Sequence, residues 1–132
     1  MERQCKSALL IAKFLEQHKK VNQVNYPGLV SSKSHARGKQ FLCGFGGMLS
    51  FIIEGGIKTA DAFISKLDIP ISTASLGGVE SLITRPVQTS HSLLSDEELE
   101  LAGIDKSLIR MSVGIESVND LIDDISQALD SI

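Results

Sequence analysis

Residues Leu108–Glu116, Leu-Ile-Arg-Met-Ser-Val-Gly-Ile-Glu, constrain the fold most, because they read as a strand that passes directly into a helix. Side chains alternate between the two faces of a strand. One face therefore takes Ile109, Met111 and Val113, and the other takes Leu108, Arg110 and Ser112. Arg110 is a permanently charged fork in an apolar segment, which suits a bound carboxylate. An internal ion pair with an Asp or Glu is the alternative.

Strand and helix patterns alternate along the rest of the chain. Apolar residues recur at helical spacing in residues 2–17, 58–67 and 117–129, and strands are expected at residues 21–26, 48–53 and 79–83. Ser95 and Glu98 form a capping box for a further helix that ends at Gly103. Residues 30–40 are expected to be a loop with one helical turn near His35. The pattern predicts a single two-layer α/β domain, with helices packed on one face of a sheet.

Polar and charged side chains are expected on the solvent side of these elements. In the last helix, Asp120, Asp123, Asp124 and Gln127 are placed outside the apolar stripe. Arg85 is expected at the surface.

Length and charge narrow the classes of function. The 132 residues suit one domain with a hydrophobic core. The net charge is −3 and no basic run occurs, which argues against nucleic acid as a partner. No apolar run is long enough to span a membrane, so no membrane partner is expected. Cys5 and Cys43 lack metal-ligand spacing and are expected to be buried or partly buried thiols in a reducing cytoplasm. No metal site is expected.

Two glycine-rich segments are candidates for ligand-binding loops. Gly44–Gly47 lacks the lysine and hydroxyl residue of a phosphate-binding P-loop and leads into a strand. Ser75-Leu76-Gly77-Gly78 is a sharp turn whose backbone N–H groups could cradle an anion. A plain connection between strands is the alternative for this second segment.

The order and spacing of several motifs together resemble one enzyme family over nearly the whole chain. The motifs are Tyr26-Pro27-Gly28-Leu29, His35, Gly44–Phe51, Ser75–Ile83, Thr89-Ser90-His91, Ala102-Gly103-Ile104 and Leu108–Glu116. They resemble the C-terminal domain of the trans-sulfuration enzymes. This is the pyridoxal-phosphate-dependent family of cystathionine lyases and synthases, methionine γ-lyase and O-acetylhomoserine sulfhydrylase.

The resemblance implies the small C-terminal domain of an aminotransferase-like fold, residues 1–132, from a carbon–sulfur lyase or a related synthase. It implies that Arg110 grips the substrate α-carboxylate and that Ser75 helps hold it. Several cystathionine-handling members carry an acidic residue where this chain has Ala74. Its absence leaves methionine, homocysteine, cysteine or an activated homoserine ester open as substrates.

The resemblance also implies parts that this chain does not carry. The family's Schiff-base lysine and its cofactor-phosphate residues belong to a large domain that precedes this segment, and the family usually forms homotetramers. We therefore expect the chain to begin inside the helix that links the two domains, to bind no pyridoxal phosphate specifically and to be inactive alone. A free-standing module that binds amino-acid carboxylates, and a structural remnant of a broken gene, are the alternatives.

Overall fold

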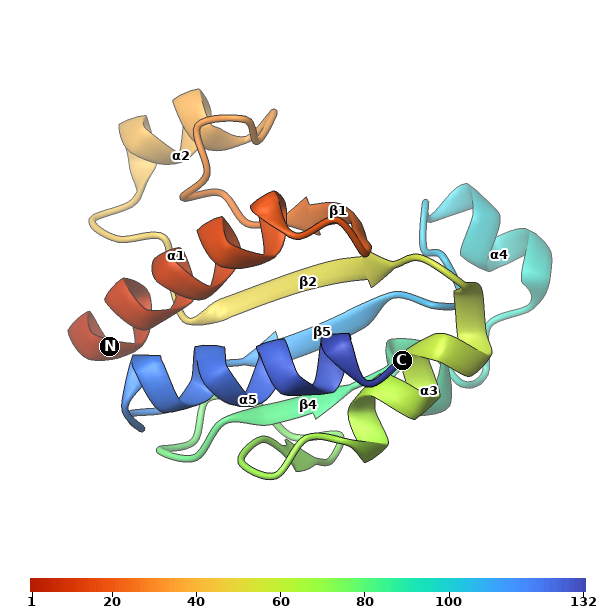
Figure 1. Cartoon of the computed structure of the whole chain (residues 1–132). Coiled ribbons are helices and arrows are strands. Elements are labelled where there is room, and N and C mark those ends of the chain that lie inside the picture. Colours follow the sequence, from red (N-terminus) through yellow and green to blue (C-terminus); the bar gives the residue numbers. More distant parts are fainter.

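The computed structural model describes residues 1–132 and contains one five-stranded mixed sheet (Figure 1). Its strands lie in the order β1-β2-β5-β4-β3. The antiparallel pairs are β1–β2, β2–β5 and β5–β4, whereas β3 and β4 are parallel. The strands are β1 (Val21–Asn25), β2 (Met48–Ile53), β3 (Ile71–Ser72), β4 (Leu82–Thr84) and β5 (Ile109–Ser112).

Three of the five α-helices form a layer on one face of the sheet. Helices α1 (Glu2–Gln17) and α5 (Val118–Asp130) lie side by side across the central strands, and α3 (Gly56–Ser65) packs beside α5 (Figure 1). Helices α2 (His35–Phe41) and α4 (Asp96–Leu101) lie at the periphery, and a 3-10 turn, η1 (Pro86–Gln88), follows β4. The predicted two-layer arrangement is confirmed.

The core lies between this helical layer and the sheet. Strand β2 buries Leu49, Phe51 and Ile53 in strict alternation, as a strand with one covered face requires. Phe51 meets Phe63 of α3 edge to face, with ring centroids 5.8 Å apart. Each such fully buried side chain stabilises the fold by about 1.5–3 kcal/mol.

Tyr26, the only tyrosine, joins the end of the first strand to α1 and to the segment Gly44–Gly47. Its hydroxyl donates to the carbonyl oxygen of Gly46 at 2.9 Å and approaches that of Cys5 at 3.3 Å. Burial, with a smaller contribution from Cys5, raises the pKa of Tyr26 to about 12.

The boundaries of several elements differ from the sequence prediction. Residues 35–41 form a complete short helix where a loop with one turn was expected, and Gly38 packs against Phe45. Strand β4 spans residues 82–84 instead of 79–83. The predicted capping box of α4 is confirmed, with both reciprocal bonds between Ser95 and Glu98 present.

Asp124 was placed on the outside of the last helix, and that prediction is wrong. It is buried in α5, and its carboxylate accepts hydrogen bonds from the backbone N–H groups of Asp68 and Ile69. These N–H groups follow α3, and the Asp124 carboxylate supplies the acceptor for both of them. A helical wheel cannot show this contact.

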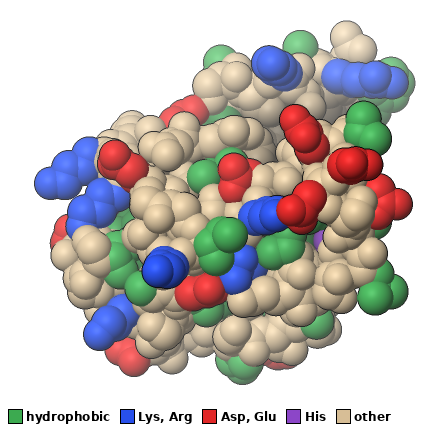
Figure 2. All heavy atoms as spheres, turned by 90° about the vertical axis from the view of Figure 1, so that its right-hand side faces the viewer, with side chains coloured by type: hydrophobic (Ala, Val, Ile, Leu, Met, Phe, Trp, Pro, Cys, Tyr) green, Lys and Arg blue, Asp and Glu red, His purple; other side chains and the backbone are tan.

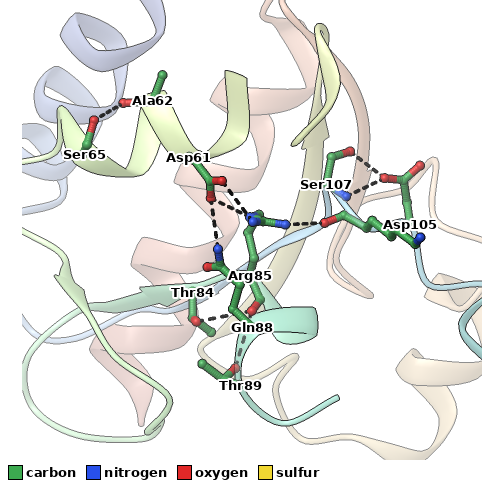
Figure 3. A network of polar contacts seen from close by, with 10 residues as sticks. Asp61, Ala62, Ser65, Thr84, Arg85, Gln88, Thr89, Asp105 and Ser107 are labelled. Carbon is green, nitrogen blue, oxygen red and sulfur yellow. Dashed lines mark hydrogen bonds and ion pairs between the residues drawn. The ribbon is translucent and has the colours of Figure 1, made fainter. Parts of the chain in front are cut away.

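Arg85 was expected at the surface, and it is buried instead. Figure 3 shows the network of polar contacts around it. Its Nε and Nη2 donate to the two carboxylate oxygens of Asp61, at 2.7 and 3.0 Å, and its Nη1 donates to the carbonyl oxygen of Lys106. Arg85 thus joins α3, the end of β4 and the loop before β5. In that loop, hydrogen bonds from the side chain and backbone N–H of Ser107 lower the pKa of Asp105.

On the face seen in Figure 2, several acidic side chains gather toward the right-hand edge, and acidic and basic side chains are interspersed over the rest. No helix is long and apolar enough to cross a membrane. Cys5 is partly buried as predicted, but Cys43 is exposed, and both thiols are free.

Candidate functional site

Arg110 lies on the face of the sheet that the helical layer leaves uncovered. Its neighbours along β5, Ile109 and Met111, are fully buried against the helices, so the alternation places Arg110 opposite them. The register sets Arg110 between Ser50 of β2 and Thr84 of β4. The predicted two faces of this strand are confirmed, and Arg110 is half-buried.

The guanidinium of Arg110 contacts the loop that carries Ala74 and Ser75. Its Nη2 donates to the carbonyl oxygen of Ala74 at 2.8 Å and to that of Ser75 at 3.3 Å. The two ion pairs of the structure belong to Arg85 and Lys106, so the internal ion pair considered for Arg110 is not present. Nε and Nη1 of Arg110 have no hydrogen-bond partner within the chain, which leaves two donors for another group.

The loop of residues 73–81, which we call the glycine loop, is tied down along its length. The N–H of Gly77 donates to the hydroxyl of Ser112 at 2.8 Å, and the amide of Gln4 donates to the carbonyl oxygen of Gly78 at 2.9 Å. The N–H of Ile115 donates to the carbonyl oxygen of Val79. Gly77 has φ +77°, a conformation that favours glycine. The loop is therefore a defined part of the site.

The three residues predicted for this site lie together in space. Ala74 and Ser75 are both exposed at the start of the glycine loop, and their carbonyl groups meet Arg110. The sequence did not single out the polar side chains in the neighbouring strands. Asn25 donates to the hydroxyl of Ser50 at 3.2 Å, which extends the polar row from Arg110 to β1. The alternation of side chains between the two faces of β1 and β2 is the sequence pattern that could have indicated this row of polar residues.

The lysines of the chain do not form a site for pyridoxal phosphate. None of the nine is buried, and the half-buried Lys20 donates its ammonium protons to the carbonyl oxygens of Leu129 and Ile132. A lysine that forms a Schiff base is desolvated or placed beside another cation so that its amine is neutral. These lysines therefore do not fit the cofactor.

The fold and site define a two-layer α/β domain with a cationic fork on its helix-free face. Comparison with known proteins extends this description. The sequence matches the family model for "Cys/Met metabolism PLP-dependent enzyme" over residues 1–130. The chain belongs to this pyridoxal-phosphate-dependent family, and the predicted family membership is confirmed.

Individual relatives agree with this family. The chain is 46% identical to a cystathionine γ-lyase of Dictyostelium discoideum, covering 98% of this chain and 34% of the relative. It is 40% identical to an L-methionine γ-lyase of Fusobacterium nucleatum subsp. polymorphum, covering 100% of this chain and 33% of the relative.

A solved structure shows the same fold. The crystal structure of cystathionine γ-synthase from Xanthomonas oryzae pv. oryzae, in complex with cystathionine, superposes with a TM-score of 0.95 at 40% identity. The match covers 98% of this chain and 34% of that one. The predicted aminotransferase-like fold is confirmed, and the chain spans about a third of the length of the relatives it matches.

Proposed function

We propose that this chain is the small, C-terminal domain of a pyridoxal-phosphate-dependent carbon–sulfur lyase, and that Arg110 binds the substrate α-carboxylate. The observation that carries the proposal is that Nε and Nη1 of Arg110, a half-buried residue, have no partner within the chain, while the glycine loop holds Nη2. A related synthase or O-acetylhomoserine sulfhydrylase is the alternative within the family. The rest of the enzyme would hold the cofactor.

The geometry supports a carboxylate as the ligand of Arg110. A guanidinium binds a carboxylate through two parallel hydrogen bonds, from Nη2 together with Nε or Nη1, as Arg85 binds Asp61. In Arg110 both Nε and Nη1 are free to join Nη2 in such a pair. One edge of Arg110 is held by the carbonyl oxygens of Ala74 and Ser75, so the fork has a defined direction. Ser75 has no side-chain hydrogen bond within the chain, and we assign its hydroxyl to the same carboxylate. Such a contact orients the bond at Cα that must break.

The substrate proposed is a sulfur amino acid without a distal ammonium group. Ala74 is exposed beside Arg110 and carries no charge that could recognise such a group. Methionine, homocysteine, cysteine or an activated homoserine ester would fit this neutral position. The proposed partners are the large domain and further copies of the enzyme. Leu76, Val79 and Ile115 support this, because they are exposed apolar residues around the glycine loop. The two free thiols support a cytoplasmic setting.

The test uses a chimera in which this chain replaces the matching segment of the Fusobacterium methionine γ-lyase. Arg110→Ala should lower kcat/KM by about 30- to 5,000-fold, because losing one partner of a desolvated charged pair costs about 2–5 kcal/mol. The visible spectrum of the bound cofactor should stay unchanged. Arg110→Lys should recover only part of the activity, since an ammonium forms no planar fork.

Arg37→Ala is the matched control, because Arg37 is exposed on α2 and has no ion pair. Near-normal kcat/KM in the Arg110→Ala chimera would mean that Arg110 does not bind the carboxylate. Binding of L-methionine to the isolated chain with a Kd below about 1 mM would favour the free-standing binding module instead.

A further inference from the structure

Glu116 and Ser81 form a second contact between the end of β5 and the glycine loop. The carboxylate of Glu116 accepts from the backbone N–H of Ser81 at 2.5 Å through one oxygen, and from the Ser81 hydroxyl at 2.9 Å through the other. The Ser81 hydroxyl in turn accepts from the N–H of Gly114 at 2.8 Å. We call these three residues the Glu116–Ser81 clasp.

The clasp is closely packed around Gly114. Ser81 is fully buried, and its hydroxyl is both donor and acceptor within the clasp. A Cβ atom on Gly114 would lie 2.3 Å from the carbonyl oxygen of Val79 and 2.4 Å from a Glu116 oxygen. Only glycine allows the two backbones this close approach. The clasp therefore holds the loop against the residues that follow β5 with little freedom.

Four residues, at the end of β5 and directly after it, form hydrogen bonds with the glycine loop. Ser112 holds Gly77, Ile115 holds Val79, and Gly114 and Glu116 hold Ser81. Arg110, on the same strand, holds the carbonyl groups of Ala74 and Ser75. The loop and the guanidinium are thus fixed relative to one continuous stretch of backbone.

We propose that Glu116, acting through Ser81, is a positioning residue for the carboxylate site at Arg110. This inference rests on the proposed function of Arg110. Glu116 does not contact the substrate in this scheme, because both of its oxygens already accept from Ser81. Without the clasp, the far end of the glycine loop is released, and Ala74 and Ser75 lose their fixed distance from the guanidinium.

The first experiment measures amide hydrogen exchange by NMR in the 132-residue chain. In Glu116→Gln, exchange at Gly77 should rise about 10- to 100-fold, since hydrogen bonds to a charged group are the strong ones and the loop would open locally. Glu54→Gln is the matched control: Glu54 is exposed after β2, its side chain has no hydrogen bond or ion pair, and the substitution removes the same charge. In this control, amide exchange at Gly77 should stay within about twofold of that in the parent chain.

A second variant keeps this test decisive if Glu116→Gln does not fold. Glu116→Asp retains the charge but is one methylene too short to reach both donors of Ser81, and it should raise Gly77 exchange in the same direction. Unchanged exchange at Gly77 in a folded Glu116 variant would overturn the proposal.

The second experiment uses the methionine γ-lyase chimera. Glu116→Gln should lower kcat/KM for methionine about tenfold, mainly through KM, whereas Glu54→Gln should leave kcat/KM unchanged. Because the clasp acts through the carboxylate site, its effect should nearly vanish in the Arg110→Ala background. A purely structural role would give additive losses in that cycle and would overturn the inference. If Arg110→Ala left kcat/KM nearly normal, the proposed function would be overturned instead, and the exchange experiment would still decide whether the clasp holds the loop.

Discussion

Arg85 and Arg110 lie near each other in the sheet, on or after the paired strands β4 and β5, yet their surroundings give them different roles. Arg85 gives all three of its donor nitrogens to the chain, through Asp61 and the carbonyl oxygen of Lys106. Arg110 uses only one, although it lies on β5 beside the strand that Arg85 follows. A buried guanidinium with complete partners contributes to structure, whereas one with free donors is available to a ligand.

The titration of Tyr26 tests whether its phenol is buried in the folded chain. The neutral phenol is favoured in the folded chain, so its contribution to stability is present below pH 10 and is lost as the pH rises toward about 12. Tyrosinate absorbance should therefore titrate near pH 12 in the folded protein and near pH 10 in urea. The absence of tryptophan and of any second tyrosine makes the signal specific.

Tyr26→Phe is the control for this titration, and it should abolish the absorbance change altogether. A midpoint near pH 10 in protein that circular dichroism shows to be folded would contradict the buried, hydrogen-bonded phenol.

Ala74 offers a test of substrate selection. In the methionine γ-lyase chimera, Ala74→Glu should raise the ratio of kcat/KM for cystathionine to that for methionine about two- to fivefold. A partly exposed ion pair with the distal ammonium would contribute about 0.2–1 kcal/mol. Ala74→Gln, of similar size and no charge, should leave the ratio unchanged. A constant ratio in Ala74→Glu would show that this side chain does not reach the substrate.

At the scale of elements, the Arg85–Asp61 pair should connect α3 to the loop before β5. Asp61→Ala leaves a buried guanidinium without its carboxylate, and we expect it to lower the free energy of unfolding by about 1–2 kcal/mol in urea. Lys106→Ala removes the exposed pair with Asp96 but keeps the backbone carbonyl that Arg85 uses, and it should cost less than about 0.5 kcal/mol. Equal costs for the two variants would argue against this connection.

Elements defined by local periodicity could be predicted from the sequence, and elements defined by distant contacts could not. The predictions for α1, α5, β2 and β5 agree with the structure, because each carries its own apolar face. The error at Asp124 arose because its partners, Asp68 and Ile69, lie more than 50 positions away. Arg85 was misplaced for the same reason.

Only part of the candidate site could be predicted from the sequence. Alternation placed Arg110 and Ser112 on one face of β5, and the structure confirms this. The contact of Arg110 with Ala74 and Ser75, 36 and 35 positions away, depends on the path of the glycine loop. Nothing in the local pattern of either segment determines that path.

For the whole molecule, we predict that the isolated chain folds cooperatively. A core of 19 buried apolar residues joins all three helices of the layer to the sheet. Circular dichroism should show a mixed helix and strand spectrum with one thermal transition. A featureless coil spectrum would refute this. Light scattering at high concentration should also detect self-association, because Phe41, Leu76 and Val79 are exposed apolar side chains.

The order of strands in the sheet has a consequence for how the chain acquires its structure. Strand β5 lies between β2 and β4, although its partners in β2 are about 60 positions earlier in the chain. The centre of the sheet therefore closes only when two remote segments meet, and such a topology slows the search for the native state. During synthesis, α1 and α3 can already cover part of the apolar face of β1 and β2, but the centre of the sheet and the helical layer stay incomplete until residues 109–130 follow. This interval is when the nascent chain is most exposed to aggregation and most in need of a chaperone.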